Sequence, residues 1–125
     1  MTPQEQGELS SVLGANLARA LSMSIVTLPA DGAIAIDKDA TYLLTKGSAA
    51  AMTLADPGAD NIGRRIGIVA GSDFAHVVTT TAALANGTAV KSVWTSAAFT
   101  GSAVTLRAIS ATLWAVEANQ LGVFT

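Results

Sequence analysis

Hydrophobic residues follow two different patterns along the chain, one before and one after about residue 22. In the first part, apolar side chains recur at three- and four-residue steps, as they do on one face of a helix; they are Leu9, Val12, Leu13, Leu17, Ala20 and Leu21. The run Thr2-Pro3-Gln4-Glu5 has the residues that begin a helix, with a capping threonine, a proline at the first helical position and a glutamate that completes a capping box. The pattern predicts an N-terminal α-helix over residues 2–21.

This helix needs a surface to pack against. Gly7 and Gly14 each weaken it by about 1 kcal/mol relative to alanine, and a helix of this length is marginal alone. The surface is either the rest of the same chain or a neighbouring subunit, and the sequence leaves both open. In the second case the interface side chains are Leu9, Leu13, Leu17 and Leu21. We therefore divide the chain into an N-terminal helix or arm, 1–22, and a single β-domain, 23–125.

After residue 23, short runs rich in Val, Ile and Thr are separated by turn residues, which is typical of strands. The predicted strands are 24–28, 33–36, 40–45, 51–55, 64–70, 74–81, 93–99, 103–109 and 113–117. Asn86-Gly87 is a turn dipeptide, so residues 82–88 are interpreted as a loop or a short hairpin. Short strands at this spacing predict a mainly β fold, an antiparallel β-sandwich or barrel with one N-terminal α-helix.

Alternation assigns side chains to faces within two of these strands. One face of 74–81 carries Phe74, His76, Val78 and Thr80, and the apolar face of 103–109 carries Val104, Leu106 and Ala108. Strands of this kind belong to sheets with one buried side. Trp94 falls in a strand of mixed pattern and Trp114 lies between Leu113 and Ala115, so we expect both in the core rather than on a sugar-binding platform.

Composition indicates a protein that associates with others. Charged residues make up 13% of the chain, against roughly 25% in typical soluble domains. No apolar run approaches the ~20 residues needed to cross a bilayer, so the apolar surface is expected to meet protein, first of all other copies of the chain. The net charge of −2 and seven scattered basic residues argue against nucleic-acid binding. The polar, acidic N-terminus does not resemble a signal peptide, so we expect synthesis in the cytoplasm.

The residues that carry catalysis or bind metals are sparse. His76 is the single histidine, no nucleophile-elbow motif accompanies it, and the chain has no cysteine. We interpret it as a histidine hydrogen-bonded within the fold, and predict no catalytic residue, no cofactor and no metal site. The acidic groups Asp37/Asp39 and Asp56/Asp60/Asn61 lack the spacing of a calcium loop and are interpreted as turn residues.

The adjacent pair Arg64-Arg65 is the densest positive charge in the chain. Two interpretations remain open. Both arginines lie at a strand edge, where charge discourages unwanted strand pairing, or they face an acidic partner surface. In the second case Arg64 and Arg65 are interface residues.

Four runs between residues 64 and 117 together resemble a known class of module. They are residues 64–69 (RRIGIV), 75–79 (AHVVT), 98–108 (AFTGSAVTLRA) and 113–116 (LWAV). The order and spacing of their residue types resemble those of small β-modules in structural proteins of tailed phages. Such modules occur in head-decoration (cement) proteins, head fibres and tail-fibre segments. The N-terminal helix departs from the minimal module.

The resemblance implies a non-enzymatic virion protein. It implies a trimer or another symmetric oligomer seated on the major capsid protein or another virion protein, most simply as a capsid decoration protein on the capsid surface. The alternative that it leaves open is a tail-fibre or spike module that binds a host receptor or glycan.

Overall fold

The computed structural model describes residues 24–87 and 89–125. The predicted N-terminal helix, with Leu9, Leu13, Leu17 and Leu21, lies outside the described residues. The strands are β1 (Ser24–Leu28), β2 (Gly32–Ile34), β3 (Ala40–Leu44), β4 (Ala51–Leu54), β5 (Arg65–Ala70), β6 (Val77–Asn86), β7 (Ala89–Thr95), β8 (Ala103–Ser110), β9 (Leu113–Gln120) and β10 (Val123–Phe124), with one 3₁₀ turn, η1 (Ala59–Asn61). This part of the chain contains no helix that is long and apolar enough to cross a membrane.

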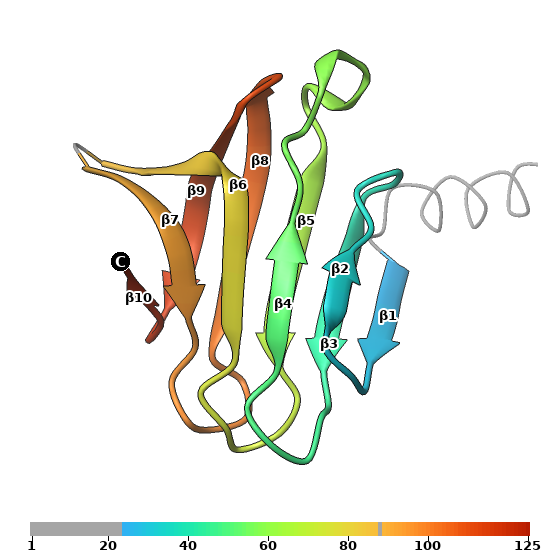
Figure 1. Cartoon of the computed structure of the whole chain (residues 1–125), viewed down its shortest axis with the longest axis vertical. Coiled ribbons are helices and arrows are strands. Elements are labelled where there is room, and N and C mark those ends of the chain that lie inside the picture. Colours follow the sequence, from blue (N-terminus) through green and yellow to red (C-terminus); the bar gives the residue numbers. More distant parts are fainter. Residues whose placement is uncertain (1–23, 88) are drawn as a thin grey trace, which may run out of the picture.

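The ten strands form one sheet that curls into a half-barrel (Figure 1). Its strand order is β1-β3-β5-β8-β9-β6-β4-β2, with β7 paired to β6 and β10 paired to β7. One layer holds β1, β3, β5, β8 and β9, and the other holds β2, β4, β6, β7 and β10 (Figure 1). Pairing between β6 and β9 joins the layers on one side, and the sheet ends at β1 and β2 on the other.

From β1 to β6 the chain passes back and forth between the two layers. Each return places the new strand beside the previous strand of the same layer and parallel to it, as in β1–β3, β3–β5, β2–β4 and β4–β6. The mainly β prediction is confirmed, but the expectation of a purely antiparallel sheet is wrong. Antiparallel pairing is confined to the later strands, in β5–β8, β8–β9, β6–β7 and β7–β10.

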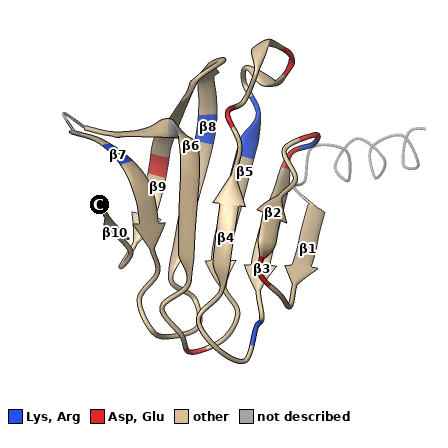
Figure 2. Cartoon of the chain, in the orientation of Figure 1, with Lys and Arg blue, Asp and Glu red and all other residues tan. Residues whose placement is uncertain are grey.

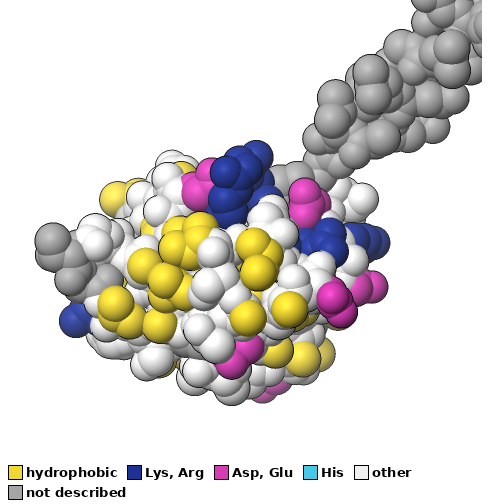
Figure 3. Space-filling view, turned by 90° about the horizontal axis from the view of Figure 1, so that it is seen from above, with side chains coloured by type: hydrophobic (Ala, Val, Ile, Leu, Met, Phe, Trp, Pro, Cys, Tyr) yellow, Lys and Arg dark blue, Asp and Glu magenta, His cyan; other side chains and the backbone are white. Residues whose placement is uncertain are grey.

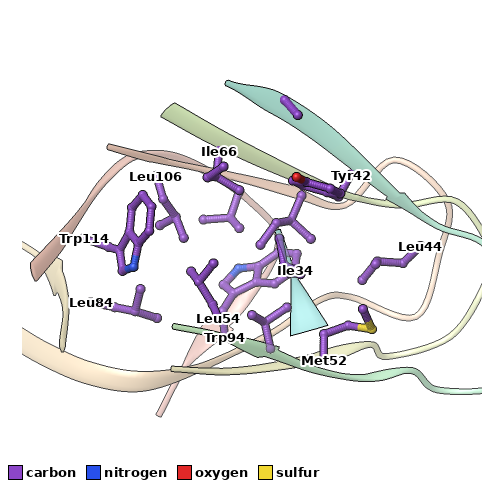
Figure 4. Close-up of a cluster of buried hydrophobic side chains, with 14 of the residues drawn as sticks. Ile34, Tyr42, Leu44, Met52, Leu54, Ile66, Leu84, Trp94, Leu106 and Trp114 are labelled. Atoms are coloured by element: carbon purple, nitrogen blue, oxygen red, sulfur yellow. The ribbon is translucent and has the colours of Figure 1, made fainter. Parts of the chain in front are cut away.

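The core lies between the layers and receives side chains from both (Figure 4). Val104, Leu106 and Ala108 point into it, which confirms the predicted apolar face of this strand. Trp94 and Trp114 are 1% and 0% exposed, so their assignment to the core is also confirmed. Each indole N–H has an acceptor, as buried tryptophans require: Trp94 Nε1 donates to Asn119 Oδ1 at 2.9 Å, and Trp114 Nε1 donates to the Ala55 carbonyl at 3.0 Å.

Of the loop and the short hairpin left open for residues 82–88, the structure shows a hairpin, formed by β6 and β7. The chain does not break at residue 82: β6 continues to Asn86, and the following strand begins at Ala89 instead of residue 93. A register shift between Thr79 and Leu84 separates two parts of β6. Its second part pairs with β9 as well as β7, so this small-residue segment closes the half-barrel. The turn itself falls at Gly87, whose φ of 66° suits glycine.

Candidate binding surface at the loop end

Connections between strands gather at both ends of the half-barrel, and one end is extensively hydrogen-bonded (lower end in Figure 1). We name this set of connections the loop end. It consists of residues 29–31, 45–50, 71–76, 96–102 and 121–122.

His76 occupies the centre of the loop end and is fully buried. Its Nδ1 accepts a hydrogen bond from the Ala50 backbone N–H at 3.0 Å. The Ser72 hydroxyl donates to the Lys46 carbonyl at 2.7 Å and therefore accepts from His76 Nε2, 3.0 Å away. These partners assign the ring proton to Nε2, and they confirm the interpretation of His76 as a histidine hydrogen-bonded within the fold.

The backbone of His76 is tied to the next loop. Its N–H donates to Ser96 Oγ at 2.9 Å, and its carbonyl accepts from the Ser96 N–H at 2.8 Å. The buried Ser102 continues the connection, since its hydroxyl accepts from the Ala97 N–H and donates to the Gln120 carbonyl. Hydrogen bonds, with one step along the backbone from Ser96 to Ala97, thus connect residue 46 to the end of β9.

Two carboxylates complete the network on its solvent side. Asp31 accepts from Lys46 Nζ and the Ala51 N–H, both at 2.9 Å, and these bonds lower the pKa of its carboxyl group. Asp73 accepts from the Thr100 N–H at 2.8 Å and the Thr100 hydroxyl at 2.9 Å, which likewise lower its pKa. Asp31 joins the first two loops and Asp73 joins the third to the fourth, so the loop end is cross-linked across its whole width.

Large apolar side chains project from this cross-linked frame. Phe74 is 39% exposed, Phe99 is 45% exposed and Leu121 is 62% exposed. The Asp73–Thr100 bonds hold the two phenylalanine loops together, one residue away from each ring. Exposed apolar groups on loops whose positions are already fixed are typical of protein-binding surfaces, because little order remains to be lost on binding.

The turn that carries Leu121 is built with unusual geometry. Leu121 has φ of 64°, a left-handed conformation that costs a branched side chain about 1–2 kcal/mol. Asn119 Nδ2 donates to the Gly122 carbonyl at 2.9 Å and holds the turn in place. Gly122 lies against the Trp94 ring, where an added Cβ would be 2.1 Å from Nε1. Strain of this kind persists where the surroundings impose it, and it often accompanies function.

The opposite end of the molecule has a different character. Viewed from above, it shows scattered apolar side chains, with several basic groups and neighbouring acidic groups at its margin (Figure 3). Arg65 makes a two-pronged contact with Glu117, at 2.9 and 3.1 Å, which raises the pKa of the guanidinium group. Arg107 Nε lies 3.8 Å from the same carboxylate, and Arg64 pairs with Asp39 at 3.4 Å. Most of the residues in the strands are uncharged (Figure 2).

The prediction that Arg64 and Arg65 lie at a strand edge is wrong. Arg65 begins β5, an inner strand that pairs with β3 and β8, and Arg64 immediately precedes it. Both side chains reach solvent because this is where the strand starts, at the end of the sheet. Their charges are partnered within the chain, and the hypothesis of an acidic partner remains a prediction.

The acidic groups that invited a calcium interpretation hold the chain together instead. Asp39 accepts from the Arg65 N–H at 3.1 Å, Asp56 accepts from the Thr81 hydroxyl at 2.8 Å, and Asn61 Nδ2 donates to the Pro57 carbonyl at 2.9 Å. Within residues 24–87 and 89–125, no group of three or more His, Cys, Asp or Glu side chains is placed to hold a metal ion.

The loop end was not predicted as a site from the sequence. Phe74 and Phe99 both fall inside predicted strands, 74–81 and 93–99, so the pattern gives no reason to expect them on loops. The one available signal was their position next to turn residues, Asp73 and Thr100-Gly101. Comparison of the chain with models of known protein families and with curated proteins gives no match.

Proposed function

We propose that this chain is a non-enzymatic structural protein of a phage virion, a capsid decoration protein that docks on its partner through the loop end. The observation that carries the proposal is the pair of exposed phenylalanines on loops held together by the Asp73–Thr100 bonds. The resemblance of residues 64–117 to phage structural modules supplies the class of partner, the major capsid protein.

The mechanism is stabilisation by selective binding. A protein that binds only the assembled capsid lattice stabilises that lattice by mass action. Aromatic anchors placed centrally in an interface contribute the largest share of binding energy. The hydrogen-bonded loops present these anchors in one arrangement, which reduces the ordering cost of docking.

Binding to purified capsids that lack this protein tests the proposal. We expect the wild type to sediment with capsids, and Phe99→Ala or Phe74→Ala to weaken binding about tenfold or more each. Ile62→Ala is the matched control, because Ile62 is also an exposed apolar residue but lies at the opposite end. Absence of capsid binding by the wild type, or equal losses in all three variants, would show that the proposal is wrong.

A tail-fibre or spike module that binds a host glycan is the second candidate. The exposed phenylalanines favour it, because sugar-binding sites combine exposed aromatic rings with polar neighbours, and here a carboxylate and a threonine lie beside them. Trp94 and Trp114 are in the core and do not serve this role. Glycan-array binding that is lost in Phe99→Ala and kept in Ile62→Ala would support this candidate over capsid decoration.

A further inference from the structure

The half-barrel has an open side, where both layers of the sheet end. Among the described strands, β1 pairs only with β3, and β2 pairs only with β4. Residues 29–31 connect β1 directly to β2, so the two free edges lie close together on the same side of the molecule (Figure 1). We call the edges of β1 and β2 the open edges.

The open edges carry few of the features that normally prevent strand pairing, although β2 is only three residues long. Proteins protect a free strand edge with charged residues, proline or a bulge. The strands here, SIVTL and GAI, contain no charged residue and no proline, and their pairing has no register shift. Ile25 in β1 is 73% exposed, the largest fraction among the exposed large hydrophobic residues described.

Core side chains are also incompletely covered on this side. Val26, Leu28 and Ile36 pack against the core but remain only partly buried. They belong to β1 or follow β2, so they lie at the opening between the layers. Strands added to the open edges would bury these side chains and would also pair with edge backbone groups that no other described strand pairs with.

We infer that the open edges pair with those of a second copy of this chain. Two copies of an uncharged edge do not repel each other, so the open edges of two identical chains can pair. Since both edges lie on one side of the molecule, a copy that meets both must present the same side, and such a contact has twofold symmetry. The twofold pairing is antiparallel, and the strand lengths match when β1 meets β1 and β2 meets β2.

This arrangement is a dimer that continues both layers across the interface. The phage resemblance implies a trimer or another symmetric oligomer, and a dimer is of the second kind. The inference does not depend on the function of the loop end. Pairing over the full length of β1 sets Val26 opposite itself and Ile25 opposite Thr27 of the other copy, because the twofold axis passes through the middle residue.

The first test is the mass of the full-length protein in solution by light scattering. We expect a dimer for the wild type and a monomer with an unchanged circular dichroism spectrum for Ile25→Lys and Thr27→Lys. Val90→Lys is the matched control, because Val90 is 64% exposed in β7, away from the open edges, and this variant should remain dimeric. A monomeric wild type would overturn the inference, and the open edges would then be available to residues 1–23 or to another protein. Equal dissociation of all three variants would also overturn it.

The second test uses the absence of cysteine from the chain, which makes any disulfide of a single-cysteine variant intermolecular. A mixture of Ile25→Cys and Thr27→Cys proteins should form a disulfide-linked dimer on mild oxidation, because facing residues on paired strands meet the geometry of a disulfide. The same mixture with Val90→Cys replacing one partner should not. No cross-link in the first mixture, or equal cross-linking in both, would overturn the inference.

Discussion

Replacement of His76 by alanine should destabilise the protein by removing the centre of the loop end. The imidazole is fully buried, so its removal leaves a cavity, and the Ala50 N–H loses its acceptor inside the protein. The unpaired donor alone costs about 1–3 kcal/mol. Together with the lost packing, we expect a decrease of about 3–5 kcal/mol in the free energy of unfolding. A domain of this size has roughly 5–15 kcal/mol in total, so the variant should remain folded near room temperature only by a narrow margin.

His76→Asn separates the hydrogen bond from the packing. An asparagine Oδ1 occupies nearly the position of the histidine Nδ1 and can accept from Ala50, so this variant should lose about half as much stability as His76→Ala. Urea unfolding followed by tryptophan fluorescence measures both, with the slope of the transition checked for constancy. Equal losses in the two variants would refute the role assigned to the Nδ1 contact, and a loss below about 1 kcal/mol in His76→Ala would refute the central role of the ring.

Three further predictions address the strained turn, the carboxylates and the charged end. Gly122→Ala should lower stability by about 1–3 kcal/mol because its Cβ would overlap the Trp94 ring, whereas Gly47→Ala, with open space around it, should be nearly neutral in thermal unfolding. The hydrogen bonds that lower the pKa values of Asp31 and Asp73 stabilise the fold at a pH above the ordinary carboxyl pKa. This stabilisation is lost as the pH falls through the lowered pKa values and the carboxylates are protonated. Asp73→Asn should therefore flatten the loss of stability below about pH 4 in acid titration. Glu117→Gln should change the melting temperature little in high salt, because its ion pairs are solvent-exposed.

The residue pattern predicted a strand correctly where the bounds and faces of that strand depend on its own residues alone. The β1 range was predicted residue for residue, and the burial of Val104, Leu106 and Ala108 followed from simple alternation. Of the two interpretations of residues 82–88, the hairpin is confirmed, with its turn at Gly87, and the loop that alanine and asparagine indicate is wrong because β6 continues to Asn86. There a contact with β9, distant in sequence, overrides local preference and keeps the segment extended.

The passage of the chain back and forth between the layers could not be predicted from the sequence, because the number of residues between successive paired strands varies. Ser24 in β1 lies opposite Ala40, 16 positions later, whereas Ala40 lies opposite Ile66, 26 positions later. Connections of unequal length leave no repeat that a sequence search detects. Without a repeat, short strands separated by turns are most simply interpreted as antiparallel neighbours, whereas the first strands of this sheet pair in parallel.

The loop end could not be predicted for a related reason. Its hydrogen bonds join positions far apart in sequence, such as Asp73 with Thr100 and Ser102 with Gln120. Single residues gave partial information: the interpretation of His76 as a hydrogen-bonded structural residue is confirmed, but its partners Ala50 and Ser72 carry no recognisable motif. A site built from backbone amides and serine hydroxyls has no characteristic residue types, so it can hardly be recognised in a sequence.

The position of the C-terminal hairpin has a consequence for how the chain folds during synthesis. β8 and β9 lie between β5 and β6 in the sheet, although they are made after both. Until the ribosome has released Trp114, β1 to β6 have all been made but β9 cannot yet join their two layers, so one side of the core is expected to face water. Nascent chains that end before β9 should therefore bind chaperones and resist compaction, while chains only slightly longer should become resistant to protease in a single late step.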